Sequence, residues 1–320
     1  MSTNVAPFTV QPRLTQIAMA IKPEGFIADE VCPRVPVPAE KFIYTKMNTD
    51  EAFTIPDVRV GRTGAPNQVE FGGVDVTDST EDYGLDDPVP NKDIANAVGT
   101  NYDPLEAAAE RTALLVRMAR EQRVANLYFA LNTYAAALRS TLAGTSQWSD
   151  YANSDPVSAI LNQFDSMLVR PNIGIVGRAV WTKLRMHPKV VAAVLNSDKG
   201  IGGAAAAGVV QRKAVADLLE LDDIYVGESF ANVAKKGQAA GYARLWGKHA
   251  AFLRIDKAVR DARMAVPTFA FTAQWGDQIA GTFTDSKIGL QGGQVVRVGE
   301  HVKELVAFQE VGTFFQNAVA

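Results

Sequence analysis

Hydrophobic positions between residues 104 and 138 recur at helical spacing and predict one long amphipathic helix. One face collects Leu105, Ala108, Ala109, Thr112, Leu115, Val116, Ala119, Leu127, Ala130 and Tyr134. The opposite face carries Glu106, Glu110, Arg117 and Glu121. Asp103, Pro104 and Glu106 form the sequence of a capping box at its start. A helix that continues to about Leu138 is roughly 50 Å long, which favours a flattened, plate-like subunit with this helix as its spine.

The chain before this helix has a different pattern. Prolines punctuate residues 1–38 and favour an extended arm, whereas the alternating pieces FIYTK, DVRVG and QVEFGGVDV predict a long β excursion between residues 41 and 96. Ten acids lie between Asp50 and Asp87, against the two bases Arg59 and Arg62. A two-stranded excursion is marginal in water, so it must rest on this chain or on another copy, unless it is simply a solvated acidic loop.

Helices and strands alternate after residue 150. The patterns predict a helix capped by Ser154 or Asp155, a buried strand NIGIVG, and a helix interrupted near His187 and Pro188. A helix VQRKAVADLLEL and a strand DDIYVG follow. From about Thr268 the pattern is β again, in TFAFTAQW, GQVVRVGEHVKELVAF and GTFFQNAVA.

Composition limits the classes of protein that fit. The chain has 320 residues, of which 47% are hydrophobic and 21% charged, and a net charge of −3, so it gives no global reason for attraction to nucleic acid or membranes. No apolar run reaches the length of a membrane span, and the N-terminus lacks the pattern of a signal peptide, so we expect a cytoplasmic protein. Cys32 is the only cysteine, which excludes an intrachain disulfide and favours a small buried hydrophobic residue.

The chain contains a match to the dinucleotide-binding fingerprint, but without the strand and helix that must flank it. Gly200, Gly202 and Ala205 match G-x-G-x-x-G/A, and Asp222 follows near the spacing of a ribose-binding acid. A helix precedes these glycines, however, and Asp222 precedes its strand instead of ending one. The stretch is better interpreted as a mobile loop of small residues.

A hydrolase pattern is the second enzymatic alternative. Ser229 in VGESFA nearly matches the nucleophile elbow, and Asp256, Asp261 or Asp277 and then His301 follow in the order of a triad. Ala231 stands where the elbow needs glycine, and no oxyanion loop is visible. His187 and His249 are isolated, so we expect no metal site and no catalytic residue.

The order of several segments resembles the major capsid proteins of tailed bacteriophages with the Hong Kong 97-like fold. The segments are GFIADEVCPRVPVPAEKFIYTK, AFTIPDVRVGRTGAPNQVEFG, EDYGLDDPVP, the long helix, DDIYVGESFANVAKKG and KIGLQGGQVVRVGEHVKELV. The resemblance implies an α+β fold with an N-terminal arm (1–39), an extended β-hairpin loop (40–98), a peripheral domain (99–170 and 261–320) that contains the spine helix, and an axial domain (171–260).

The resemblance also implies a function. The chain would be a coat protein that self-assembles as pentamers and hexamers into an icosahedral shell around the genome, in a virion assembled in the host cytoplasm. It implies a separate scaffold, decoration or portal proteins as further partners, and packaged DNA held by non-specific proximity, with no cofactor, metal or membrane. An encapsulin-type compartment shell is the structural alternative, and a serine hydrolase that uses Ser229 is the enzymatic one.

Two sets of residues are expected at contacts between copies. The aromatic residues of the extended loop, Phe42, Tyr44, Phe53 and Phe71, are too many for a solvated loop and are expected to lie against a neighbouring subunit. By the same resemblance, the loop with Gly200, Gly202, Gly203 and Gly208 is expected to face the axis of the capsomer.

Overall fold

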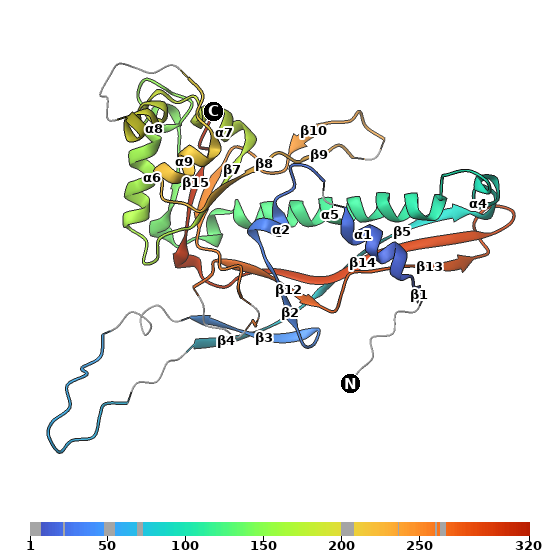
Figure 1. The fold of residues 1–320 in the computed structure, drawn as a ribbon, viewed down its shortest axis with the longest axis horizontal. Helices are drawn as coiled ribbons and strands as arrows, with labels where there is room; N and C mark the ends of the chain where they lie inside the picture. Colours follow the sequence, from blue (N-terminus) through green and yellow to red (C-terminus); the bar gives the residue numbers. More distant parts are fainter. Residues whose placement is uncertain are drawn as a thin grey trace.

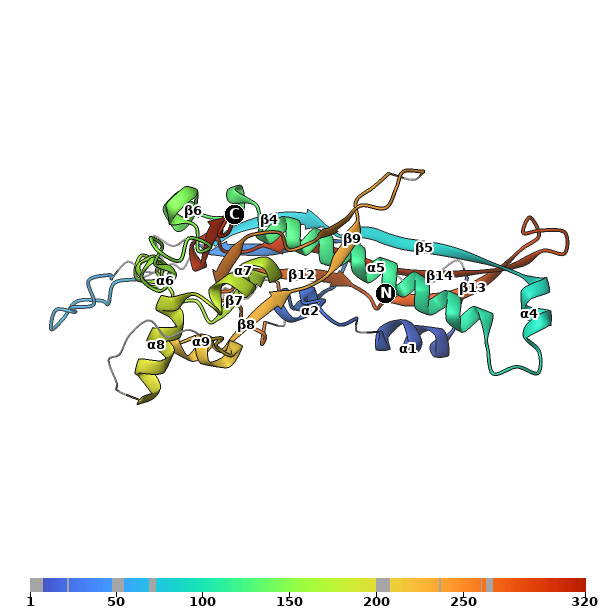
Figure 2. The ribbon, with the colours of Figure 1, turned by 90° about the horizontal axis from the view of Figure 1, so that it is seen from above.

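A 25-residue helix, α5 (Pro104–Tyr128), runs along the long axis of the molecule (Figure 1). This computed structural model describes residues 8–21, 23–47, 55–68, 73–199, 208–235, 237–259, 261–262 and 267–320. A twisted sheet lies along α5, and a cluster of helices and short strands gathers at one end (Figures 1 and 2). The molecule is elongated along this helix (Figures 1 and 2). No helix in these ranges is long and apolar enough to cross a membrane.

The start of α5 matches the prediction and its end does not. Asp103 accepts a 2.9 Å hydrogen bond from the Leu105 amide, while Glu106 pairs with Arg13 instead of reaching back to the cap. The helix ends at Tyr128, not near Leu138. The chain then turns back, and the Tyr134 hydroxyl donates to the Tyr128 carbonyl at 2.7 Å. Short 3-10 turns follow: η1 (Leu131–Thr133), η2 (Ala136–Leu138) and later η3 (Gly144–Ser146).

The sheet along α5, called the large sheet below, has the strand order β1-β13-β14-β12-β2, and β5 pairs with β14 outside this path. It contains β1 (Thr9–Val10), β2 (Arg34–Val37), β5 (Glu81–Pro90), β12 (Ala270–Trp275), β13 (Ile279–Asp285) and β14 (Gly293–Val306). Ala108, Ala109 and Ala113 of α5 are buried with Val296 and Val298 of β14, since small side chains let helix and sheet approach closely.

Three short helices flank this assembly. They are α1 (Pro12–Ala20), α2 (Ala28–Val31) and α4 (Asn91–Ala97). Leu14 and Ala18 of α1 are buried against α5, so part of the predicted extended arm is a helix attached to the spine. Cys32 is fully buried, as predicted, and burial raises the pKa of its thiol.

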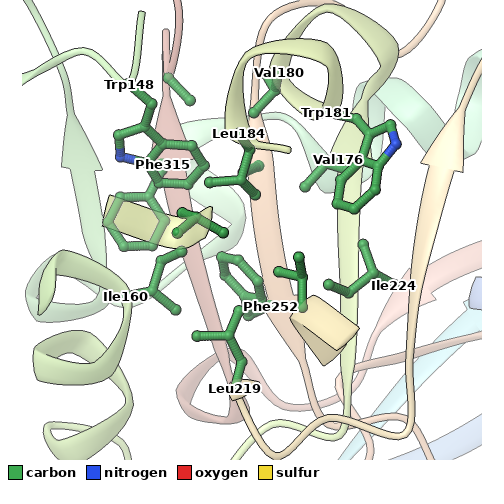
Figure 3. Close-up of a cluster of buried hydrophobic side chains, with 14 of the residues drawn as sticks. Trp148, Ile160, Val176, Val180, Trp181, Leu184, Leu219, Ile224, Phe252 and Phe315 are labelled. Carbon is green, nitrogen blue, oxygen red and sulfur yellow. The ribbon is translucent and has the colours of Figure 1, made fainter. Parts of the chain in front are cut away.

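The second sheet, called the small sheet below, has the order β6-β15-β11-β7-β8. Its strands are β6 (Arg139–Thr141), β7 (Ile173–Gly177), β8 (Asp223–Gly227), β11 (Ala250–Leu253) and β15 (Gly312–Gln316), the last after a turn η4 (Gln309–Val311). The helices around it are α6 (Pro156–Asp165), α7 (Arg178–Leu184), α8 (Pro188–Lys199) and α9 (Arg212–Leu218). Figure 3 shows Trp148, Phe252 and Phe315 meeting the apolar faces of these helices.

Most predicted elements of this half are confirmed. Asp155 caps α6 by accepting from the Ser158 amide at 3.1 Å, and the helical pattern breaks between Leu184 and Pro188. The predicted strands NIGIVG and DDIYVG are β7 and β8, and they pair in parallel. Residues 196–199, directly before Gly200, form the end of α8, in agreement with the helix expected before the glycines.

Two antiparallel ribbons project from the body. The first consists of β3 (Lys41–Met47) paired with β4 (Gly73–Ser79), and the second of β9 (Phe230–Asn232) paired with β10 (Tyr242–Arg244). The predicted strand DVRVG is wrong for this chain, since residues 55–68 have no regular secondary structure. Within the described residues no strand lies beside this segment to pair with its main chain.

Candidate inter-subunit surfaces

The base of the extended loop packs on its own chain. Phe42 is 4% exposed and Tyr44 5%, and the ring of Tyr44 meets Phe271 of β12 edge-on at 6.4 Å. The Thr45 amide also donates to the Ala262 carbonyl at 3.4 Å. For Phe42 and Tyr44, the support that the sequence requires is therefore within the subunit. Phe53 and Phe71, the other two expected contact residues, lie outside the described residues.

The tip of the extended loop (residues 55–68) is exposed throughout. Ile55 is 91% exposed, Val58 82% and Val60 47%, although these side chains are apolar. Figure 1 shows the tip beyond the ribbon of β3 and β4, away from the body. Among the described residues no side chain covers these apolar groups.

Acidic and basic residues lie in different parts of the extended loop, which the total of ten acids does not show. The tip carries Arg59 and Arg62 against Asp57, so it is basic. Three acids of β5 pair with cations of the same chain: Glu81 with Lys303, Asp86 with Arg297, and Asp87 with Arg111. The fourth, Asp82, lies 2.5 Å from Nδ1 of His301. The hydrogen bond from Lys303 lowers the pKa of Glu81. The acidic part of the loop is therefore largely neutralised inside the subunit.

Two adjacent residues of α5 fix the arm. Glu121 accepts from the amides of Ile27 and Ala28 at 2.9 and 2.8 Å, and Arg120 donates to the Cys32 carbonyl at 3.1 Å and pairs with Asp29. Burial alone would raise the pKa of Asp29, but Arg120 and Arg34 outweigh it and hold that pKa below its usual value.

Sequence reasoning placed Glu121 on the polar face of the helix, yet it is 1% exposed. Residues 27–32 and Trp246 cover it, and because they are remote in sequence no local pattern could reveal this. Burial raises the pKa of Glu121, and the three hydrogen bonds that its carboxylate accepts oppose that rise. Glu121 and Arg120 therefore attach the arm to the spine.

The ribbon of β9 and β10 is a second exposed surface, and sequence reasoning missed it. Phe230 is 47% exposed and Tyr242 74%, and the Arg244 guanidinium lies 4.3 Å above the ring of Phe230. The strand register places Phe230 opposite Arg244 and Tyr242 opposite Asn232, so all four share one face. The signal that could have revealed it is the pair of short β-prone pieces around the lysine–glycine turn.

The glycine loop is only partly described. Gly200, Gly202 and Gly203 lie outside the described residues, so their expected place at a capsomer axis stays a prediction. Gly208 is described and exposed, and an added Cβ there would meet only Cγ1 of Val191, at 3.7 Å. The Asp222 carboxylate, which the dinucleotide interpretation would use to bind a ribose, accepts a 3.1 Å hydrogen bond from the Asn172 side chain.

The residues of the hydrolase pattern do not form a nucleophile–base pair. Ser229 Oγ is buried and makes no hydrogen bond in the described structure. His301 lies on β14, where its Nδ1 is 2.5 Å from Asp82 and its ring packs on Trp275. His187 is buried beside Ser154, with 3.0 Å between Nε2 and Oγ, and it accepts from the Lys189 amide. No three metal-ligating side chains gather within the described ranges.

Comparison with known proteins gives two relatives in sequence. The chain is 49% identical over 315 residues to the major capsid protein of Pseudomonas phage JBD67, covering 98% of this chain and 99% of that one. It is 24% identical over 272 residues to the major capsid protein of Burkholderia phage BcepMu, covering 82% of each chain. No family model matches the chain.

Solved structures show the same fold at low sequence identity. A phage-related protein from Bordetella bronchiseptica RB50 superposes with a TM-score of 0.73 at 18% identity, covering 98% of both chains. The capsid protein of cyanophage P-SCSP1u gives 0.54 at 10% identity, over 89% of this chain and 86% of that one. The SrpI encapsulin of Synechococcus elongatus PCC 7942 gives 0.51 at 11% identity, over 98% of this chain and 92% of that one.

Proposed function

The chain belongs to the major capsid proteins of bacteriophages, and from this premise we propose that it self-assembles into the icosahedral shell around the genome of a tailed double-stranded DNA phage. The single observation that carries the proposal is the 49% identity to the capsid protein of Pseudomonas phage JBD67 over 99% of that chain. Likeness of that degree over the full length leaves little of the chain for a different role.

The architecture fits the Hong Kong 97-like fold, with the boundaries inferred from the sequence. Residues 1–39 then form the arm, 40–98 the extended loop, 99–170 and 261–320 the peripheral domain, and 171–260 the axial domain. With these boundaries α5 and strands β12, β13 and β14 of the large sheet fall in the peripheral domain, and helices α7, α8 and α9 with strands β7, β8 and β11 fall in the axial domain. The loop with Gly208 would face the capsomer axis, where small residues tolerate rings of two sizes.

Two exposed surfaces supply contacts between copies. The tip of the extended loop offers Ile55, Val58 and Val60, and the ribbon of β9 and β10 offers Phe230 and Tyr242. These surfaces differ from one another, as the head-to-tail contacts of a ring require. Burial of apolar area at about 25 cal/mol per Å² would provide the driving force, repeated in every copy. Pentamers and hexamers would be the building units, with a scaffold and portal as separate proteins.

A catalytic role is not part of the proposal, because Ser229 has no hydrogen-bonded base and His301 is engaged with Asp82. An encapsulin-type compartment is the second candidate, and the encapsulin neighbour with a TM-score of 0.51 favours it. The sequence relatives at 49% and 24% identity are phage proteins, and we therefore prefer the virion shell.

Electron microscopy and sizing of the expressed full-length chain test this function. The expected products are capsomer rings or closed particles of megadalton mass, formed with or without the scaffold of a related phage. Co-expression of the phage scaffold separates the two shell types: a virion shell should need it for uniform closure, whereas an encapsulin should close uniformly alone. A protein that stays monomeric under both conditions would refute a shell function.

A further inference from the structure

A cavity of about 600 Å³ opens between the arm, helices α7 and α9 and strand β8. Residues 25–27 of the arm form one wall, and the Glu228 amide donates a 3.3 Å hydrogen bond to the Gly25 carbonyl. Tyr225 and Val226 of β8 form another part of the lining. This volume is in the range of small-molecule binding sites, so the cavity has room for a ligand larger than a single ion.

Three arginines line this cavity, which is called the arginine cavity below. Arg178 and Arg212 are the first residues of α7 and α9, and Arg185 directly follows the last residue of α7. Positions 178, 181 and 185 are three and four residues apart, so they share one face of the helix. Trp181 lies between the two arginines of this face, and the Arg185 guanidinium is 5.8 Å from the centre of its ring. Figure 3 shows Trp181 in the apolar cluster around the small sheet, which fixes the orientation of this helix face.

The lining of the arginine cavity has an excess of positive charge. It contains three guanidinium groups and one carboxylate, Glu228, whose Oε1 is 2.6 Å from Nη1 of Arg178. The Nε of Arg212 is 3.5 Å from Asp223, a residue outside the lining. The salt bridges among the described residues do not include Arg185. Each guanidinium has five N–H donors, so these contacts leave donors for a bound anion.

A buried atom of Arg185 is an independent sign of a ligand. Its Nε is buried and has no hydrogen-bond acceptor among the described residues. A buried donor of a charged group that lacks an acceptor loses its hydration without compensation, which destabilises the folded chain. Because Arg185 lines the cavity, an anion bound there would supply the acceptor that the protein itself does not.

We propose that the arginine cavity binds an anion that carries phosphate groups. Guanidinium groups bind phosphate oxygens through pairs of charge-assisted hydrogen bonds. Three of them, from two helices, suit a tetrahedral group with several oxygens better than a planar carboxylate, and one arginine already holds the carboxylate of the lining. The volume exceeds the size of one phosphate, so the ligand carries several: a free polyphosphate or nucleotide, or a stretch of nucleic-acid backbone. This binding goes beyond the proposed shell function, because it needs only one subunit.

Calorimetric titration of the full-length, unassembled chain with sodium tripolyphosphate tests this site. The wild type should bind at one site per subunit, and Arg185→Gln should weaken binding by about tenfold or more, because a charge-assisted hydrogen bond is lost. Arg170→Gln is the matched control: it removes the same charge at an exposed residue outside the lining, where Arg170 pairs with Glu220. The control should bind within about twofold of the wild type. A wild type that does not bind, or equal binding by the two variants, overturns the proposal.

A second variant keeps the test valid if Arg185→Gln does not fold. The Arg212 side chain is 52% exposed at the start of α9, so Arg212→Gln leaves the apolar cluster intact. It should weaken the binding of tripolyphosphate by about threefold or more, through the loss of one guanidinium. Circular dichroism checks the fold of each variant. Binding by folded Arg212→Gln with the affinity of the wild type overturns the assignment of this arginine to the site, and the proposal with it.

Two further probes identify the source of the phosphate groups. Oligothymidine that binds more tightly than tripolyphosphate, and loses affinity in Arg185→Gln, supports the site and assigns it to nucleic-acid backbone. Tripolyphosphate that binds while oligothymidine does not supports the site and assigns it to a free polyphosphate or nucleotide. A glutamate peptide that binds as tightly as tripolyphosphate overturns the choice of phosphate. Because these titrations use unassembled chain, their failure leaves the shell function untouched, and the failure of the shell function is seen separately, in the absence of particles.

Discussion

The indole Nε1 of Trp246 donates a 2.6 Å hydrogen bond to Oε1 of Glu121. This fully buried side chain beside the small sheet therefore contacts α5, the helix that packs on the large sheet. The same carboxylate accepts from the amides of Ile27 and Ala28. One residue of α5 thus joins Ile27 and Ala28 to Trp246, across three segments that are far apart in the sequence.

Removal of the Glu121 side chain should destabilise the subunit strongly. Glu121→Ala leaves the Trp246 indole and two arm amides without their acceptor, and we expect the free energy of unfolding to fall by about 3 kcal/mol or more. Chemical denaturation of the unassembled subunit measures it. Gln122→Ala, at an exposed neighbouring position on the helix, is the control and should change little. Equal stabilities of the two variants would contradict the role assigned to Glu121.

Stability should fall in mildly acidic solution. Burial lowers the pKa of His187 and of His249, so the folded state binds protons less readily than the unfolded chain. The histidine contribution to stability is therefore complete above the ordinary imidazole pKa of about 6.5 and is lost progressively as pH falls below it. Denaturation at a series of pH values from 8 to 5 tests this, and His187→Gln should flatten the curve. The raised pKa of Glu121 acts in the opposite direction and equally in both proteins, so the comparison of the two curves decides. A wild-type curve that falls no more steeply toward acid than the His187→Gln curve would be inconsistent with these shifts.

Substitution of two glycines by alanine should have different effects, because Gly227 is closely packed and Gly208 lies in an open loop. A Cβ at Gly227 would lie 2.1 Å from Cγ of Trp246, so Gly227→Ala should lower the free energy of unfolding by about 3 kcal/mol or more, or prevent soluble expression. Gly208→Ala, whose nearest contact is 3.7 Å away, should stay within about 0.5 kcal/mol of the wild type. Melting temperatures of the two variants provide the measurement. Similar losses in both would show that the strand can relax around the methyl group.

Deletion of residues 50–68, with a short glycine turn in their place, should give a folded subunit that no longer closes shells. Phe42 and Tyr44 remain buried on β12, so the base of the loop keeps its intramolecular support. Light scattering compares particle formation by intact and deleted chains, and circular dichroism checks that both fold. Normal particles from the deleted chain would place the essential subunit interface elsewhere.

Ser229→Ala should leave assembly unchanged and stability unchanged or slightly raised. The Ser229 hydroxyl is buried without a hydrogen bond, and the loss of an unsatisfied polar group of this kind is neutral or favourable by about 1 kcal/mol. Particle yield, melting temperature and an esterase assay are the readouts. An esterase activity that disappears with this hydroxyl would contradict the structural role proposed for the chain.

Local patterns predicted most elements because they depend on neighbours in sequence. The Asp103 cap, the break before Pro188 and the strands β7 and β8 all follow from side chains within a few residues of one another. The end of α5 was missed because the Tyr134 hydroxyl satisfies the Tyr128 carbonyl only after the chain has turned back. The strand predicted in residues 55–68 was wrong because a strand needs a partner, and none lies beside it within the described residues.

The sequence by itself determined the class of element along most of the chain, and its segment order resembled one family of shell proteins. The tertiary structure decided which polar residues are buried and which apolar ones are exposed. Periodicity places Glu121 on the polar face of its helix, yet segments distant in sequence bury it. Val58 belongs to the predicted strand DVRVG, yet its side chain is exposed to solvent. Periodicity reports only the geometry of one element, whereas burial depends on contacts between segments far apart in the chain, which form only when the chain folds or meets another copy.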